Sequence, residues 1–364
     1  PPPPPDNYTL THSSAASDVY KRQLQQQGQI GIDTEFMRER TYYAQLCLTQ
    51  IATADETWCV DPLAGHTQDA FWKEILAHDW VLHSARQDIE VVYQTAGSMP
   101  TSIFDTQIAA GLLGFPAQMG YAGLVKELFD VEIHKSHTRA DWSKRPLRTE
   151  YLDYAAEDVE YLLPAYEILT DKLEEKGRLD WALEDSRWLL DPALYVISDS
   201  QAIDRLKGAR NFRGRRRAAA ERLAAWREAE AIKLDRPRQW IMRDHVLLDI
   251  ADTLPRSEQE MANIQGVPLK LVKRVGRQLL EEIAASANDD TSHSPPQRPD
   301  EGQKVLLKEM QSRVAACAKD LDIAAETVAS KRELSAVIIS GSRKSRVFSG
   351  WRADLIGADL LALL

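Results

Sequence analysis

The stretch that decides the fold is Gly31-Ile-Asp-Thr-Glu-Phe36. Apolar and polar residues alternate along it, which predicts a β-strand with one apolar face. Residues two apart on a strand point to the same side, so Asp33 and Glu35 place two carboxylates next to each other. Like charges this close repel each other, and burial adds a desolvation cost. A divalent cation would remove this cost, while a solvated face of an edge strand is the alternative.

The surrounding patterns predict an α/β domain. After the strand, residues 45–52 and 57–60 continue the chain as a three-strand meander. A helical pattern over 68–78 then leads into a short strand over 80–83. Further helices are predicted over 87–96, 106–113 and 149–175.

Two more acidic positions accompany this strand. Asp88 opens a predicted helix directly after the short strand, and Tyr154 and Asp158 lie four residues apart on one face of the helix over 149–175. Each position also has a structural explanation, because the helix dipole favours Asp in a first turn and an amphipathic helix exposes an acidic face. The residue pattern alone leaves both explanations open.

The charge of the chain differs strongly between segments. Its 364 residues include 45 Lys+Arg and 55 Asp+Glu, a net charge of −10 that argues at first sight against nucleic acid as a partner. Residues 24–204 hold 14 basic and 31 acidic residues, a net of −17, whereas residues 205–285 hold 18 and 11, a net of +7. A polar, proline-containing linker over 288–300 precedes residues 301–364, whose 10 basic and 8 acidic residues give +2. An acidic domain therefore precedes a basic helical domain over 205–287 and a second small helical domain.

Composition also restricts the location of the protein. The cysteines Cys47, Cys59 and Cys317 are scattered, which excludes a disulfide scaffold and fits a reducing cytoplasm. No stretch approaches the ~18 uninterrupted apolar residues of a membrane-spanning helix. We expect residues 1–23 to be a non-native leader outside the fold, because the first five are all proline and residues 18–23 resemble a translated sequencing adapter.

Together, the three acidic positions resemble, in order and spacing, the three motifs of the DEDD 3′–5′ exonucleases, in the subclass with Tyr four residues before the last Asp. Within that subclass the chain is similar to the bacterial ribonuclease D family. The resemblance implies an α/β ribonuclease H-like exonuclease domain over 24–204, with a mixed sheet flanked by helices, followed by two small all-α HRDC-like domains. Further matching segments are Arg40-Thr-Tyr-Tyr43, Phe104-Asp-Thr-Gln-Ile108, Arg139-Ala-Asp-Trp142, Arg145-Pro-Leu147 and Ser349-Gly-Trp-Arg352.

The resemblance assigns Asp33, Glu35, Asp88 and Asp158 as ligands of two divalent cations, Mg²⁺ or Mn²⁺. Carboxylate oxygens suit these hard ions, and two such ions stabilise the attacking and the leaving oxygen of a displacement at phosphorus. Tyr154 is expected to orient the water, because an ordinary pKa of ~10 makes a phenol a poor general base at neutral pH. The implied reaction is the removal of nucleoside 5′-monophosphates from the 3′ end of RNA, with the 3′ maturation of tRNA precursors as the expected role.

A few residues near the motifs are candidates for RNA contact. Phe36 can stack on a terminal base, and so can the pair Tyr42 and Tyr43. His83 follows the short strand and is expected either to touch the substrate or the metal shell, or to have a structural role. Asp105 is expected to cap the helix that follows it.

The basic segment resembles the HRDC domain, a small helical module shared by helicases and ribonuclease D. Pro237 is expected to separate two of its helices. Its cations are expected to hold phosphates without reading sequence, while a solvated helix face is the alternative. They form two groups: Arg213, Arg215, Arg216 and Arg217, and Lys270, Lys273, Arg274 and Arg277.

Two other functions stay open at this point. One is a DNA 3′–5′ exonuclease, because the acidic cluster does not distinguish ribose from deoxyribose. The other is a non-catalytic RNA-binding protein with an exonuclease fold, against which the presence of all four carboxylates and Tyr154 argues. We expect RNA as the partner, tRNA precursors in particular, and a cytoplasmic monomer with no membrane and no stable protein partner.

Overall fold

The structure is a computed structural model, and it describes residues 8–11, 28–64, 68–133, 140–196, 199–289 and 299–364. The chain divides into two compact units. The first unit combines Pro1–Met37, Gln45–Asp191 and Pro299–Leu364, and the second combines Arg38–Ala44 with Pro192–Arg298. The last helical segment therefore belongs to the same unit as the predicted α/β domain.

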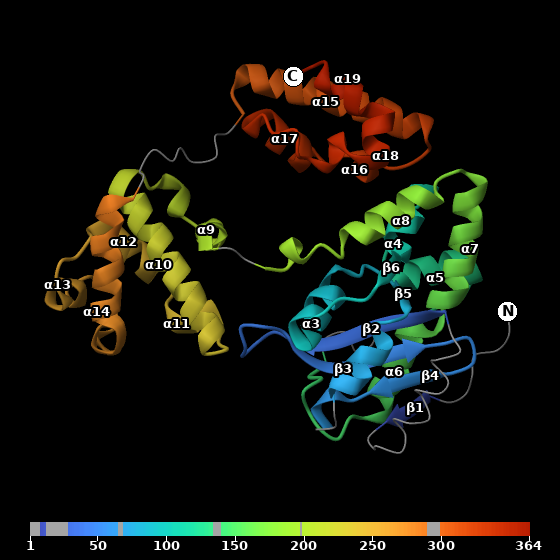
Figure 1. Cartoon of the computed structure of the whole chain (residues 1–364), viewed down its shortest axis with the longest axis horizontal. Coiled ribbons are helices and arrows are strands. Elements are labelled where there is room, and N and C mark those ends of the chain that lie inside the picture. The colour runs from blue at the N-terminus through green and yellow to red at the C-terminus, as the bar shows by residue number, and fades with distance from the viewer. Residues whose placement is uncertain (1–7, 12–27, 65–67, 134–139, 197–198, 290–298) are drawn as a thin grey trace. The chain divides into compact units, whose positions relative to one another are not determined.

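A six-stranded mixed sheet forms the centre of the first unit (Figure 1). Its strand order is β1-β4-β3-β2-β5-β6. Strand β2 is antiparallel to β3 and parallel to β5, so it lies where the sheet changes from one pairing to the other. The strands are β1 (Tyr8–Thr11), β2 (Gln29–Met37), β3 (Gln45–Ala52), β4 (Thr57–Val60), β5 (Asp79–Leu82) and β6 (Ser102–Asp105). The predicted mixed sheet is confirmed.

Strand β1 corrects the expectation for the first 23 residues. Tyr8–Thr11 lies inside the predicted leader, yet it pairs with β4 in parallel, with Leu10 opposite Cys59. Its aromatic, β-branched and apolar residues suit a strand. The expectation that no element of the fold precedes residue 24 is therefore wrong. Leader positions 1–7 and 12–23 lie outside the described residues.

Seven helices of the first unit precede residue 191 among the described residues: α2 (Gln68–Ile75), α3 (Arg86–Ala96), α4 (Thr106–Leu113), α5 (Tyr121–Phe129), α6 (Thr149–Glu160), α7 (Leu162–Glu175) and α8 (Leu179–Trp188). The prediction of a single helix over 149–175 is wrong, because the helix is interrupted at Tyr161, between α6 and α7. Pro164 explains the break, since it has no N–H for the carbonyl of Glu160 and its ring crowds that carbonyl. Sequence patterns also miss β6, α5 and α8.

The last segment of the first unit is helical, as predicted. It contains α15 (Glu301–Asp320), α16 (Ala325–Val328), α17 (Lys331–Ser340), α18 (Gly350–Arg352) and α19 (Ala358–Leu361). The Trp351 ring stacks on Trp181 of α8, with centroids 4.7 Å apart. Gly350 has a φ of +54°, and a Cβ there would collide with Glu184. The kinship of this segment with HRDC domains stays a prediction.

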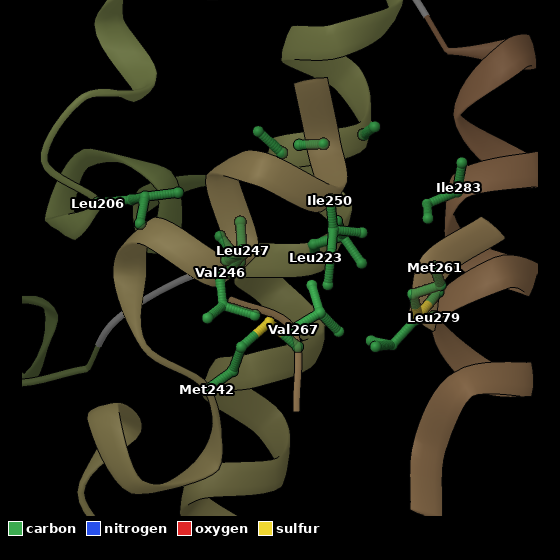
Figure 2. Close-up of a cluster of buried hydrophobic side chains, with 14 of the residues drawn as sticks. Leu206, Leu223, Met242, Val246, Leu247, Ile250, Met261, Val267, Leu279 and Ile283 are labelled. Carbon is green, nitrogen blue, oxygen red and sulfur yellow. The ribbon is translucent and has the colours of Figure 1, made fainter. Parts of the chain in front are cut away.

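The second unit is built mainly from helices around one apolar core (Figure 2). Leu223, Leu247, Ile250 and Leu279 are fully buried there. The helices are α9 (Asp199–Ala202), α10 (Gly214–Lys233), α11 (Arg238–Ile241), α12 (Asp244–Thr253), α13 (Glu258–Ala262) and α14 (Leu269–Ala285). Pro237 lies between α10 and α11, as predicted. Ala202 also packs in this core, so the helical unit extends upstream of the expected start at residue 205.

Candidate active site

A cavity of about 510 Å³ lies between β2, α3 and α6. All five predicted catalytic residues line it. Asp33 and Glu35 come from β2, Asp88 from the first turn of α3, and Tyr154 and Asp158 from α6. The spacing of two on a strand and of four on a helix therefore brings these groups to one place.

Three of the carboxylates lie close enough together to share one cation. Oxygens of Asp33, Glu35 and Asp158 all lie within 4.8 Å of one another. Asp88 is largely buried and lines the same cavity, where its Oδ1 accepts a hydrogen bond of 2.6 Å from the hydroxyl of Thr34. The predicted set of four is thus a close group of three with a fourth held beside it.

The raised pKa values of these carboxylates show that burial and mutual repulsion disfavour their charged forms. Burial, followed by the charges of Asp88, Asp158 and Glu35, raises the pKa of Asp33 well above its usual range. Burial and the charges of Asp158 and Asp88 raise the pKa of Glu35 to about 9. Burial also raises the pKa of Asp88 to about 7, although the hydrogen bond from Thr34 opposes this change. A hard divalent cation fits the site, since it would offset this repulsion with oxygen ligands.

Tyr154 stays a neutral phenol in this setting. Burial raises its pKa first, and the negative charges of Asp158 and Glu35 together with a hydrogen bond to Asp158 raise it further. Its ring packs near that of Trp142, with centroids 6.2 Å apart. These constraints suit a group that positions a reactant and do not suit a base.

Hydrogen bonds of a residue outside the cavity lining hold the loop that carries Trp142 in place. Arg145 makes two hydrogen bonds to the buried carboxylate of Asp61, of 2.6 and 2.7 Å, and a third of 2.8 Å to the carbonyl of Cys47 on β3. Trp142 is itself buried in a cluster with Tyr154. Sequence reasoning missed this role, although the segment Arg145-Pro-Leu147 was among the matches to the family.

Asp105 fixes the start of the helix that carries Asp88. Its carboxylate accepts hydrogen bonds from the amides of Ser84 and Ala85, of 3.0 and 2.8 Å, just before α3. It also caps α4 by accepting from the amide of Gln107 at 2.8 Å, so the predicted cap is confirmed. One buried side chain thus joins the β5–α3 turn to the next helix.

Two residues predicted to contact RNA also line the cavity, Phe36 and His83. The Nδ1 of His83 lies 2.9 Å from the hydroxyl of Thr106, and its Nε2 lies 2.9 Å from the carbonyl of Met119. These contacts give His83 a structural role, and RNA contact stays a prediction for both residues. Sequence reasoning missed other lining residues, namely Thr34, Ser84, Arg86, Gln87, Tyr121 and Leu162.

The Tyr42 and Tyr43 pair has other contacts in the second unit. The Tyr42 hydroxyl donates a hydrogen bond to the buried carboxylate of Glu228, and the Tyr42 amide donates one of 3.0 Å to Asp235. The Tyr43 side chain is 40% exposed. Tyr42 is therefore held by the helical unit, and neither ring is among the residues that line the cavity.

The first predicted group of phosphate-binding arginines is largely occupied by contacts within the helical unit. Arg217 is buried, and it pairs with Glu221 at 2.7 Å and with the carbonyl of Ala209 at 3.3 Å. The prediction that Arg217 contacts phosphate is therefore wrong, because its guanidinium is bound to these partners. Arg213 donates to backbone carbonyls, and Arg216 pairs with Asp252 at 2.8 Å. Exposed cations from the predicted groups are Arg213, Arg215, Arg216, Lys270, Lys273, Arg274 and Arg277.

Comparison with known proteins agrees with this geometry. A family model described as a 3′–5′ exonuclease matches residues 8–174, and one described as an HRDC domain matches residues 216–283. Ribonuclease D of Gluconacetobacter diazotrophicus is 36% identical over 99% of this chain and 93% of its own length. Ribonuclease D of Xanthomonas oryzae is 34% identical over 98% of each chain. The crystal structure of Escherichia coli RNase D, described as an exoribonuclease involved in structured RNA processing, has a TM-score of 0.89 and 29% identity over 98% of each chain.

The fold and the acidic cavity thus define a 3′–5′ exonuclease of the divalent-metal-dependent kind, followed by an HRDC domain. More narrowly, the chain belongs to the ribonuclease D family. It is a 3′–5′ exoribonuclease, a nuclease that hydrolyses phosphodiester bonds and binds nucleic acid. In the part of the chain that the structure describes, no helix is long and apolar enough to cross a membrane.

Proposed function

We propose that the chain shortens RNA from its 3′ end, one nucleoside 5′-monophosphate at a time, in the maturation of tRNA precursors. The observation that carries this proposal is the close group of Asp33, Glu35 and Asp158 in a cavity that also contains Asp88 and Tyr154. The alignment over nearly the whole chain with proteins named ribonuclease D supports RNA as the substrate.

Asp33, Glu35, Asp88 and Asp158 are proposed to hold two divalent cations, Mg²⁺ or Mn²⁺. When bound, such ions stabilise charge on the attacking and leaving oxygens at phosphorus. The fit rests on the donor set, because four carboxylates supply only hard oxygen ligands and repel one another without a cation.

Tyr154 is proposed to orient the nucleophilic water by hydrogen bonding. Its raised pKa keeps the hydroxyl proton in place, so the phenol is available as a donor and acceptor at neutral pH. Phe36 at the same cavity offers an aromatic face on which the terminal base can stack. Together these groups would orient the last nucleotide and the water.

A cytoplasmic location and a monomeric state are part of the proposal. The three cysteines are free thiols, and burial raises the pKa of Cys59 to about 12, which keeps it unreactive. Scattered reduced thiols fit a reducing compartment.

The test compares a 3′-extended tRNA with a DNA strand of matching sequence. Purified protein should shorten the RNA and release 5′-mononucleotides with Mg²⁺ or Mn²⁺, and EDTA should stop the reaction. Asp158→Ala should abolish turnover while leaving the circular dichroism spectrum unchanged. Preferential hydrolysis of the DNA would support the DNA exonuclease alternative, and full activity of Asp158→Ala would refute the proposed site.

A further inference from the structure

A second cavity lies in the helical unit, formed by α11, by the segment before α12 and by the start of α14 (elements labelled in Figure 1). Its volume is about 500 Å³, which is enough for a nucleotide. Buried apolar side chains such as Met242, Val246 and Leu271 contribute to its lining. We call this cavity the α11–α14 cleft.

The lining of the α11–α14 cleft is basic. It includes Arg243, His245, Lys270 and Arg274 and contains no Asp or Glu. Arg243, Lys270 and Arg274 form no ion pair with any residue that the structure describes. Seven other arginines of this unit form ion pairs, namely Arg205, Arg216, Arg217, Arg222, Arg227, Arg238 and Arg277. The cleft therefore carries positive charge that is available to bind phosphate, with no carboxylate in its lining.

Trp240 adds an exposed aromatic side chain to this cleft. It lines the cavity and is 59% exposed, although a large apolar side chain of this kind is usually mostly buried. Aromatic faces beside cations are the arrangement that binds single-stranded nucleic acid, because every base has a face to stack and every nucleotide a phosphate. Base pairs in a duplex are already stacked and present no free face.

We infer that the α11–α14 cleft binds an unpaired RNA nucleotide, with its base on Trp240 and its phosphates near Arg243, Lys270 and Arg274. The inference rests on the proposed action on RNA and adds a contact for a single-stranded segment beyond the 3′-terminal nucleotide. It also changes which cations of the helical unit matter, because Arg243 replaces the buried Arg217.

The test measures binding by the full chain in EDTA, so that the RNA is not degraded. The probes are a fluorescein-labelled single-stranded 20-nucleotide RNA, the same sequence as DNA, and a blunt RNA hairpin. Trp240→Ala should weaken binding of the single-stranded RNA about tenfold, whereas Trp240→Phe should stay within about threefold of the wild type. Arg274→Ala should weaken binding and reduce the slope of log Kd against log salt by about one.

Matched controls come from the same unit. Arg256→Ala removes an equal charge from an exposed residue that lies outside both predicted phosphate-binding groups and does not line the cleft. Leu269→Ala removes an exposed apolar side chain that also lies outside the lining. Both should bind RNA like the wild type. Equal losses in controls and cleft variants would overturn the inference, since they would point to a diffuse electrostatic effect.

A covalent measurement locates the contact directly. Single-stranded RNA containing 5-iodouridine should crosslink to Trp240 on irradiation, and Trp240→Phe should lower that yield. Wild-type affinity of Trp240→Ala, or crosslinks mapped only elsewhere, would refute the cleft while leaving the proposed nuclease function intact. Conversely, a failure to detect metal-dependent hydrolysis would not affect these binding measurements, because they are made in the absence of metal. Equal binding of the DNA strand would support the stacking site and show that it does not read the 2′-hydroxyl.

Discussion

The hydroxyl of Thr34 donates a hydrogen bond of 2.6 Å to Oδ1 of Asp88, which lies 54 residues further along the chain. Thr34 stands on β2 between Asp33 and Glu35, so one short strand supplies two carboxylates and orients a third. The contact also keeps Asp88 from gaining a still higher pKa, because a donor favours the charged carboxylate.

Thr34→Val should raise the concentration of Mg²⁺ needed for half-maximal activity several-fold. The substitution removes the donor and keeps the β-branched shape, so Asp88 holds its proton more strongly and competes less well as a ligand. Titration of the initial rate with Mg²⁺ checks this expectation. Thr34→Ser, which keeps the hydroxyl, should restore the wild-type response, and an unchanged response of Thr34→Val would show that the hydrogen bond is dispensable.

Tyr154→Phe should lower kcat about a hundredfold and change KM little. The variant keeps the ring that packs near Trp142 and removes only the hydroxyl proposed to orient the water. Steady-state kinetics on a single-stranded RNA gives both constants. A change confined to KM would assign Tyr154 to substrate binding instead.

Stability without metal should fall as pH rises from about 5 to 9. The pKa of Glu35 is about 9 in the folded chain and 4.5 as the ordinary value, so the folded state binds more protons across this window. A difference of one pKa unit between the folded and the unfolded chain corresponds to ~1.4 kcal/mol. We expect the free energy of unfolding to fall by at least ~1 kcal/mol across this pH range. Urea denaturation at several pH values in EDTA measures it.

Two further measurements test whether the pH dependence of stability arises at the metal site. Addition of Mg²⁺ should stabilise the protein more at pH 9 than at pH 5, because the cation takes the place of the protons. Glu35→Gln should make the metal-free profile less steep, with the remaining pH dependence coming from Asp33 and Asp88, whose pKa values are also raised. A profile that is equally steep in Glu35→Gln would assign the pH dependence to other groups.

Arg352→Met should destabilise the first unit by about 3–5 kcal/mol. Arg352 and Asp185 are both buried and joined by hydrogen bonds of 2.5 and 2.7 Å, so removal of the cation leaves the buried carboxylate with only the longer contacts to Trp351 and Arg346, of 3.3 and 3.9 Å. The shift of the urea midpoint measures the loss. Arg313→Met, which breaks an exposed pair with Glu309 in the same helical segment, should cost ~1 kcal/mol or less. Asp185→Asn in the Arg352→Met chain should recover part of the loss.

The local part of the site was predictable from sequence, and its assembly was not. Spacings of two on a strand and four on a helix set which groups share a face, so Asp33 with Glu35 and Tyr154 with Asp158 followed from periodicity. That Asp88 meets them depends on the pairing of β2 with β5, a long-range contact that no local pattern specifies. For that step the sequence argument depended on the family resemblance.

Long-range polar contacts explain the remaining errors. The pairing of Arg145 with Asp61 spans 84 residues, and that of Arg352 with Asp185 spans 167. The second contact joins the last helices to the sheet-containing unit, whereas their sequence suggested an independent domain. Arg217 looked like a surface cation because its neighbours are arginines, but its position on α10 faces the core.

The distance along the chain between Asp185 and Arg352 has a consequence for biosynthesis. All the cavity carboxylates, from Asp33 to Asp158, are synthesised before Arg352 exists to neutralise Asp185. A nascent or prematurely terminated chain therefore carries a complete acidic centre on an unfinished scaffold, with Asp185 and Trp181 lacking their C-terminal partners. We expect such a product to be less stable than the full chain and therefore to be degraded more readily by proteases.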